Sequence, residues 1–169
     1  MAEQELLYHY QVAVKGLTVD FITSEKGVRA IFINEDLITS AFLPGKKGKD
    51  FGLGTQIKEY LSGKRTQFDV PFDIGGTPFQ KSVWKKIAAI PYGKTASYQS
   101  IALKLKNEKA VRAVGTAVGT NPLPLVIPCH RVINKSGKLG GFSAAGGGEA
   151  GITIKQELLS LEQGTGKKK

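Results

Sequence analysis

The stretch Asn121-Pro-Leu-Pro-Leu-Val-Ile-Pro-Cys-His-Arg-Val132 bears on both the fold and the chemistry, since it holds the only cysteine of the chain, directly before a histidine and an arginine. Its three prolines exclude a helix, because each fixes φ at about −65° and biases the preceding residue toward extended conformations. The apolar run Leu123 to Ile127 is therefore expected to be strand-like or buried and extended. Cys129 follows this stiff segment, and the two neighbouring cations are expected to lower the pKa of its thiol.

Cys129 is either a reactive thiol or a small core residue. One cysteine forms no internal disulfide, and together with His9 and His130 it supplies too few ligands for a tetrahedral zinc site. We therefore expect no metal and no cofactor. Adjacent side chains do not generally face each other, so His130 is expected to act through a water or a relay, with a carboxylate orienting the imidazole. In the competing interpretation Cys129 fills a core gap, His130 lies on the surface and Arg131 pairs with an acid.

Two short helices are predicted upstream of this stretch. Ser97 is placed to cap the first and Asn107 to cap the second, and apolar residues recur at helical spacing in both. Two such helices joined by a turn are typical of a helix-turn-helix, whose second helix enters a DNA groove. Lys109 and Arg112 lie outside the apolar stripe of the second helix. An ordinary helical hairpin with solvated charges is the alternative.

The composition changes around Asp73-Ile-Gly-Gly-Thr-Pro78, where we place a domain boundary. Thr77 is a suitable N-cap, with Pro78 at the first helical position. The expected domains are 1–76, an α/β domain, and 77–164, a mainly helical domain, followed by a basic tail at 165–169.

In the first third of the chain, apolar and polar residues alternate as they do along the strands of a β-sheet. His9–Val14, Leu17–Ile22 and Val28–Ile33 are short and β-branched, which predicts an antiparallel meander. The segment Pro44–Lys49, rich in glycine and lysine, is a linker or a phosphate-contacting patch, and we favour the linker. Helical spacing then predicts a helix over Leu53–Leu61.

The charge of the chain favours a polyanionic partner. Twenty-four Lys and Arg against fourteen Asp and Glu give +10 and a pI near 9.7, and +7 remains without the three terminal lysines. Such an excess is typical of nucleic-acid-binding domains. No apolar run is long enough to cross a bilayer, and the N-terminus lacks the pattern of a secretory signal. We expect a soluble protein without a membrane partner, cytoplasmic, or nuclear in a eukaryote.

The string Ile127-Pro-Cys-His-Arg-Val132 resembles the active-site motif of the O6-alkylguanine-DNA alkyltransferases, also called methylated-DNA–protein-cysteine methyltransferases. The resemblance covers residues 77–164 and includes several further motifs in order: Phe79-Gln-Lys-Ser-Val-Trp84, Ile90-Pro-Tyr-Gly93, Ser97-Tyr-Gln99, Ala110-Val-Arg-Ala-Val-Gly115, Gly140-Gly-Phe-Ser143 and Lys155-Gln-Glu-Leu-Leu159. It implies an α/β fold in which a small ribonuclease H-like domain precedes a mainly helical, winged-helix-like domain for DNA binding and catalysis.

The resemblance also implies an activity. The protein would be a single-use DNA repair methyltransferase that moves an alkyl group irreversibly from O6 of guanine in duplex DNA to its own cysteine, after flipping the nucleotide. O4 of thymine is a candidate second substrate. The protein would be a monomer that binds double-stranded DNA through the minor groove.

The catalytic residues implied by the resemblance are four. Cys129 would accept the alkyl group, and His130 would deprotonate it through water. Glu162 would hold the imidazole, and Asn121 would brace the active-site turn.

The DNA-binding residues implied by the resemblance are seven. Arg112 would enter the base stack, Tyr98 would meet the flipped nucleotide, and Ser143 would lie in the pocket wall beside O6. The Tyr98 hydroxyl and a backbone N–H near Ser143 are candidate donors to the purine as negative charge develops on it. The others would contact the DNA backbone or neighbouring bases: Gln80, Gln99, Asn107 and Lys135.

Two features depart from the family pattern. Some members carry a zinc site in the N-terminal domain, for which this sequence has too few ligands. The glycine-rich stretch 144–151 is longer than in compact members, and we expect a mobile lid there, with a passive surface insertion as the alternative.

Two other functions compete with alkyl transfer: a non-catalytic module that binds alkylated DNA, and a cysteine hydrolase.

Overall fold

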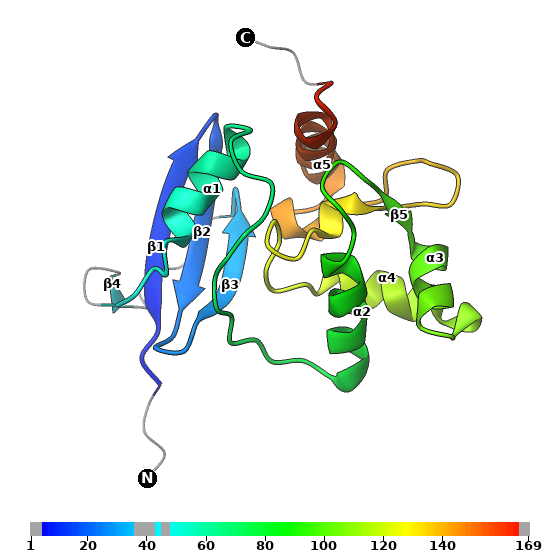
Figure 1. Cartoon of the computed structure of the whole chain (residues 1–169), viewed down its shortest axis with the longest axis horizontal. Coiled ribbons are helices and arrows are strands. Elements are labelled where there is room, and N and C mark those ends of the chain that lie inside the picture. The colour runs from blue at the N-terminus through cyan, green and yellow to red at the C-terminus, as the bar shows by residue number, and fades with distance from the viewer. Residues whose placement is uncertain (1–4, 36–42, 45–47, 166–169) are drawn as a thin grey trace. The chain divides into compact units, whose positions relative to one another are not determined.

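The structure is a computed structural model that describes residues 5–35, 43–44 and 48–165. The chain divides into two compact units, Met1–Gly75 and Gly76–Lys169 (Figure 1). Residues 45–47 of the expected linker and 166–169 of the expected basic tail lie outside the described residues. The α/β fold class expected from the sequence is confirmed, with a small antiparallel sheet in the first unit and mostly helices in the second.

The first unit is built on the predicted meander. Strands β1 (Tyr8–Val14), β2 (Leu17–Thr23) and β3 (Val28–Ile33) pair antiparallel in the order β3-β2-β1. A short strand that the sequence did not predict, β4 (Leu43–Pro44), adds to β1 in parallel. The β1–β2 hairpin turns at Lys15 and Gly16 with φ of 51° and 79°, as a two-residue hairpin loop requires.

Helix α1 (Leu53–Leu61), also predicted, covers one face of this sheet (Figure 1). Its buried residues Leu53, Ile57 and Tyr60 are fully enclosed. Gly54 allows the close approach, since a Cβ there would lie 3.3 Å from Val12 and 3.8 Å from Phe21. The core of the first unit therefore lies between α1 and the sheet.

The second unit begins with α2 (Pro78–Ala88), whose N-terminus follows the sequence signal. The Thr77 hydroxyl accepts from the Gln80 N–H at 3.1 Å, and the Gln80 Oε1 accepts from the Thr77 N–H at 2.9 Å, which completes a capping box. Trp84 fixes α2 against the fourth helix, because its indole N–H donates to the Ala117 carbonyl at 2.8 Å.

The predicted helix-turn-helix is formed by α3 (Tyr98–Lys104) and α4 (Val111–Gly119). Ser97 caps α3 as expected, with its hydroxyl accepting from the Ser100 N–H at 3.0 Å. The expectation that Asn107 caps the second helix is wrong. Asn107 precedes a 3₁₀ helix, η3 (Glu108–Ala110), and makes no capping bond with its side chain. The 3₁₀ helix, which is wound more tightly than an α-helix, contains the residues between Asn107 and the start of α4.

One other expectation is corrected by the second unit. Leu123–Ile127 is a compact turn rather than an extended run, because Leu125 has φ of 74° and the Ile127 N–H donates to the Leu123 carbonyl at 2.7 Å. The chain then continues into a 3₁₀ helix, η4 (Cys129–Arg131), and into β6 (Val132–Ile133), which pairs in parallel with β5 (Ala96–Ser97).

The glycine-rich stretch 144–151 is partly helical, which the sequence did not predict, and its expected mobility stays a prediction. A 3₁₀ helix, η5 (Ser143–Ala145), leads through glycines with positive φ into α5 (Gly148–Gln163), so the last four residues of the stretch are its first turn. Gly151 is buried, and a Cβ there would come within 2.5 Å of the Phe142 carbonyl oxygen. Glycine is needed for this close packing. Among the helices of the described residues, none is both long and apolar enough to span a membrane.

Candidate active site

Cys129 opens η4 at the end of a turn that Asn121 holds together. The Asn121 amide donates to the Ile127 carbonyl at 2.7 Å, and its oxygen accepts from the Leu123 N–H at 3.0 Å. The Cys129 N–H donates to the same Ile127 carbonyl at 2.7 Å. Hydrogen bonds from the Asn121 side chain and from the backbone thus hold the turn that places the thiol, and only 4% of Cys129 is exposed.

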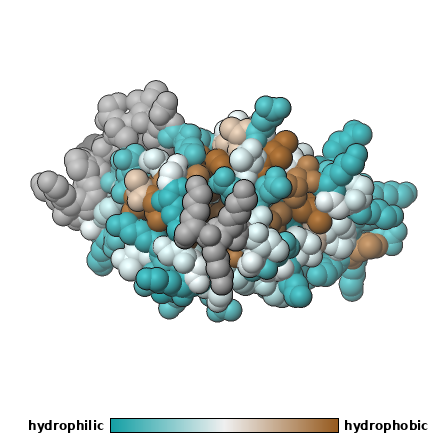
Figure 2. Space-filling model, turned by 90° about the horizontal axis from the view of Figure 1, so that it is seen from above, coloured by the Kyte–Doolittle hydropathy of each residue, from teal (hydrophilic) through white to brown (hydrophobic). Residues whose placement is uncertain are grey.

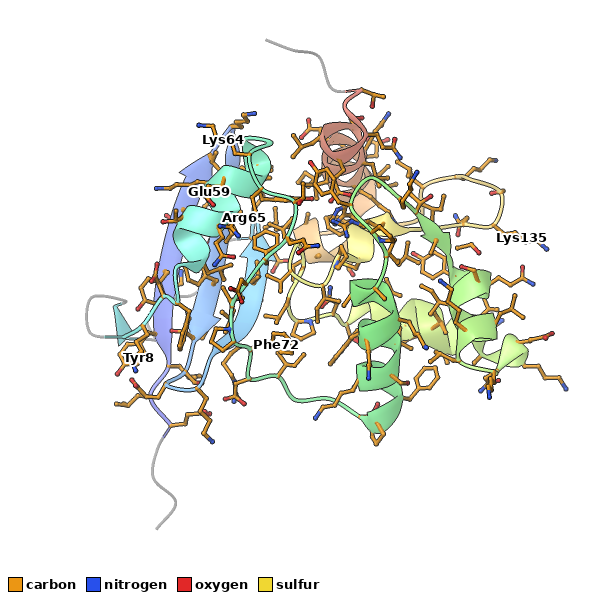
Figure 3. The ribbon with its side chains drawn as sticks, viewed as in Figure 1. Tyr8, Glu59, Lys64, Arg65, Phe72 and Lys135 are labelled. Carbon is orange, nitrogen blue, oxygen red and sulfur yellow. The ribbon has the colours of Figure 1, made fainter. Side chains whose placement is uncertain are left out.

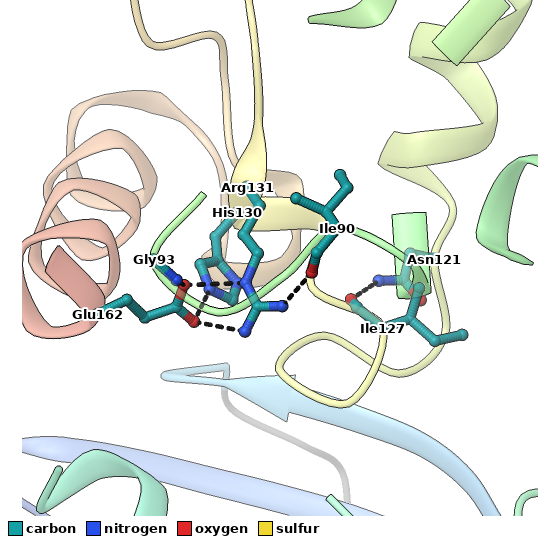
Figure 4. Close-up of polar contacts among 7 residues, drawn as sticks. All are labelled: Ile90, Gly93, Asn121, Ile127, His130, Arg131 and Glu162. Carbon is teal, nitrogen blue, oxygen red and sulfur yellow. Dashed lines mark hydrogen bonds and ion pairs between the residues drawn. The ribbon is translucent and has the colours of Figure 1, made fainter. Parts of the chain in front are cut away.

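A buried polar cluster lies directly after the cysteine (Figure 4). Its centre is the Glu162 carboxylate, near the end of α5, which accepts from His130 Nε2 at 2.7 Å. Arg131 donates to both carboxylate oxygens, through Nε at 2.8 Å and Nη2 at 2.9 Å, and the Gly93 N–H donates at 3.1 Å. Arg131 Nη1 donates to the Ile90 carbonyl at 2.6 Å. Glu162 therefore fixes the orientation of the imidazole, with Nε2 as the nitrogen that donates to the carboxylate.

Burial dominates the ionisation of both Cys129 and His130. It raises the pKa of the Cys129 thiol to about 11, although a hydrogen bond from Asn121 and the Lys155 ammonium each pull that pKa down. Burial also lowers the pKa of His130, against the opposing effect of Glu162. The expectation that the adjacent cations lower the pKa of Cys129 is thus corrected: Arg131 is committed to Glu162, and the cation that acts on the thiol is Lys155.

Cys129 borders a cavity of about 310 Å³. Half of the residues that line the cavity are glycine or alanine, and Ser143 is anchored there by donating to the Gly119 carbonyl at 2.9 Å. The complete lining is Tyr98, Gly115, Val118, Gly119, Cys129, Gly141, Phe142, Ser143, Ala144 and Gly147. Two expected site residues, Tyr98 and Ser143, therefore lie around the same cavity as the thiol.

An open groove of about 780 Å³ adjoins this cavity and shares Tyr98, Gly115 and Gly141 with it. Its lining includes four of the seven expected DNA-binding residues: Tyr98, Gln99, Arg112 and Lys135. Lys135 stands on the exposed loop after β6 (Figure 3). The groove thus combines the N-terminal end of α3, one side of α4 and this loop.

Two of the expected DNA-binding residues, Gln80 and Asn107, line neither the cavity nor the groove. Gln80 is engaged at the start of α2, where its Nε2 also donates to the Thr120 hydroxyl at 3.0 Å. Asn107 is exposed in the turn before η3. On the face drawn in Figure 2, hydrophilic side chains predominate and hydrophobic residues form smaller patches. Among the described residues, no group of three or more His, Cys, Asp and Glu side chains is arranged to hold a metal ion.

Sequence reasoning missed two cluster residues. The sequence predicts an acidic partner for Arg131 only in the competing interpretation, and it predicts no role for Lys155. Lys155 is 1% exposed, and its Nζ donates to the Val132 carbonyl at 2.7 Å. The signal was present, because Lys155 and Glu162 are one heptad apart on the apolar side of α5, together with Leu158 and Leu159.

Comparison with known proteins bears on the identity of this site. A family model described as the DNA-binding domain of 6-O-methylguanine DNA methyltransferase matches residues 78–164. The methylated-DNA–protein-cysteine methyltransferase of Methanosarcina mazei is 42% identical over 144 residues, covering 82% of this chain and 86% of that protein. The Mycobacterium tuberculosis protein of the same name is 48% identical over 112 residues, covering 66% of this chain and 64% of its own.

Solved structures agree with these relatives. The structure of Mycobacterium tuberculosis OGT in complex with DNA has a TM-score of 0.82 to this chain, at 35% identity over 94% of each chain. The match to the family model, the relatives and this likeness confirm the resemblance drawn from the motifs. The chain belongs to the methylated-DNA–protein-cysteine methyltransferases, a family of transferases.

Proposed function

We propose that this protein repairs DNA by moving an alkyl group from O6 of guanine to Cys129. The observation that carries the proposal is the position of the only cysteine, on the wall of a cavity that shares lining residues with the groove containing Arg112 and Lys135. A thiol at that point can meet a base that enters the cavity. The family relationship supports the same chemistry.

The reaction balances with Cys129 and Tyr98, which line the cavity, and with His130, which is buried next to Cys129 in the chain. His130 takes the thiol proton through an intervening water, and the thiolate sulfur attacks the alkyl carbon. A sulfur–carbon bond forms while the bond between that carbon and O6 breaks, and the electron pair passes to the purine. The Tyr98 hydroxyl is placed to stabilise the charge that develops there, and the proton returns to the base, which leaves as guanine. The resulting thioether is a poor leaving group, so each molecule acts once.

The groove supplies the proposed contact with DNA. O6 is hidden in a stacked duplex, so the nucleotide has to be extruded, at a cost of a few kcal/mol. Arg112 is exposed on α4 beside Tyr98, where it is placed to occupy the vacated position in the stack. Gln99 and Lys135 then contact the backbone from either side. We further propose that a monomer docks in the minor groove, and that O4-methylthymine is a weaker second substrate.

The test is to incubate the protein with duplex DNA containing O6-methylguanine and to weigh the peptide that contains Cys129. We expect one methyl group per molecule and no turnover, and no transfer by Cys129→Ser, which should still bind the duplex. A duplex with O4-methylthymine tests the second substrate. Binding without a mass change would indicate a non-catalytic module, and sustained turnover would indicate a hydrolase; either result would refute the proposal.

A further inference from the structure

The motif Ile90-Pro-Tyr-Gly93 forms a turn between α2 and β5 that is bound to the polar cluster at both ends (Figure 4). Arg131 Nη1 donates to the Ile90 carbonyl at 2.6 Å, and the Gly93 N–H donates to the Glu162 carboxylate at 3.1 Å. Arg131 and Glu162 form an ion pair with each other. One buried ion pair therefore holds this segment, which we call turn 90–93.

Two further contacts fix the conformation of turn 90–93. Gly93 has φ of 74°, in the left-handed region that favours glycine, and a Cβ there would lie 3.1 Å from the Glu162 carbonyl oxygen. The Arg131 guanidinium packs over Tyr92, with Cζ 5.7 Å from the ring centre. A displacement of the turn would therefore break hydrogen bonds to a buried charge and lose this packing.

Turn 90–93 leads along the chain to Tyr98. It is followed by β5 and then by α3, whose first residue is Tyr98. Strand β5 pairs in parallel with β6, which begins directly after Arg131. Tyr98 is thus connected twice to the segment that carries Cys129 and Arg131, through the turn and through the short sheet.

The position of the Tyr98 side chain bears on the chemistry of the cavity. Tyr98 and Cys129 line the same cavity, and a Cβ at Gly140 would lie 3.2 Å from the Tyr98 hydroxyl oxygen, so the hydroxyl occupies space that glycine leaves open. A donor stabilises a developing negative charge only at hydrogen-bond distance. A small displacement of Tyr98 would therefore remove its effect on the purine.

We propose that turn 90–93 is a positioning element that holds the Tyr98 hydroxyl in place at the cavity during alkyl transfer. The inference rests on the proposed function for the use of that hydroxyl and not for its placement. The Glu162 carboxylate binds two segments, because Oε1 accepts from His130, next to the nucleophile, and Oε2 accepts from Gly93, at the end of the turn. One carboxylate thus positions both the segment of the nucleophile and the segment of the proposed donor.

The experiment compares two reagents that alkylate Cys129, the only cysteine. Methyl transfer from a saturating duplex with O6-methylguanine leaves charge on the purine and uses the Tyr98 hydroxyl, whereas iodoacetamide forms its sulfur–carbon bond by releasing iodide and needs no such donor. Single-turnover rates are measured for the wild type, Gly93→Ala, Tyr98→Phe and the variant with both substitutions. Lys94→Ala, at an exposed residue beside the turn, is the matched control.

Gly93→Ala should transfer the methyl group about tenfold to a hundredfold more slowly than the wild type, because a misplaced group loses up to about a hundredfold in rate. Its reaction with iodoacetamide should stay near the wild-type rate. In the Tyr98→Phe protein, Gly93→Ala should add little further loss, since the hydroxyl that it displaces is already absent. Equal losses with both reagents, additive losses in the double variant, or a wild-type rate for Tyr98→Phe would each overturn the proposal.

A second measurement reads the placement of Tyr98 directly and covers the case in which Gly93→Ala does not fold. Tyr92→Ala removes the packing on Arg131 and leaves the backbone of the turn free of strain. The NMR resonances of the Tyr98 ring, assigned with Tyr98→Phe, should shift in Tyr92→Ala and not in Lys94→Ala. Unshifted resonances would overturn the proposal. A shift in a protein whose wild type transfers no methyl group would uphold the positioning and refute the proposed function.

Discussion

Replacing Glu162 by glutamine should destabilise the second unit rather than only slow the chemistry. The carboxylate accepts four hydrogen bonds, from His130, from two nitrogens of Arg131 and from Gly93 (Figure 4). In Glu162→Gln one oxygen remains as an acceptor, and the new NH2 group faces donors. The Arg131 guanidinium then stays buried without its countercharge.

The magnitude follows from that buried charge. Removing one partner of a buried ion pair typically costs about 3–5 kcal/mol. For a chain of this size each kcal/mol lowers Tm by about 2–4 °C, so the expected loss is roughly 6–20 °C. Since domains are stable by only about 5–15 kcal/mol, a large part of the margin would be lost.

Urea unfolding followed by Trp84 fluorescence measures this effect in the second unit alone, because Trp84 is the only tryptophan. The matched control is Glu157→Gln, an exposed site on the same helix, which should change stability by less than about 0.5 kcal/mol. If Glu162→Gln unfolds at the same urea concentration as this control, the buried network contributes nothing to the fold and the reasoning fails.

Three further results are expected. Arg112→Ala should slow repair of duplex DNA far more than reaction with free O6-benzylguanine, which needs no flipping; equal losses would assign Arg112 to the fold. Affinity for undamaged duplex should fall with salt by about 0.9 in log–log slope per neutralised phosphate, and Lys135→Ala and Lys109→Ala should each flatten that slope in binding titrations without changing lesion preference. Because burial lowers the pKa of His130 below its ordinary 6.5, the unfolded chain binds this proton at a higher pH than the folded one. Stability should therefore be complete above about pH 6.5 and fall below it, by at most about 1.4 kcal/mol per pH unit, and urea unfolding of His130→Asn should show a flatter dependence.

Local signals in the sequence predicted most of the regular elements. The meander follows from alternation and turn residues, and α2 and α3 follow from the caps at Thr77 and Ser97, which act within one turn. The paired strands β5 and β6 had no such signal, because each is two residues long and their partners lie far apart in the chain. The start of α5 was missed because three glycines oppose a helix locally, whereas packing of Gly151 on Phe142 decides it.

The active site shows the same division between features that local sequence predicts and features that depend on the assembled fold. Motifs indicated Cys129, His130 and Glu162, and the structure brings His130 and Glu162 into contact across thirty-two positions of sequence. The ionisation of the thiol could not be read from its neighbours. Adjacent charges in the sequence predicted a lowered pKa, but desolvation is a property of the assembled core, and it outweighs them.

The burial of Cys129 also bears on how the thiol survives before it is needed. Peroxides and disulfides react with thiolates that they can reach, and this sulfur is both enclosed and protonated. With a pKa of about 11 in place of the ordinary 9.0, it carries about a hundredfold less thiolate near neutral pH than an unperturbed cysteine. A protein that acts only once loses its purpose if its cysteine is oxidised first. The enclosure that leaves little thiolate on Cys129 therefore also protects the sulfur from oxidants before it reacts.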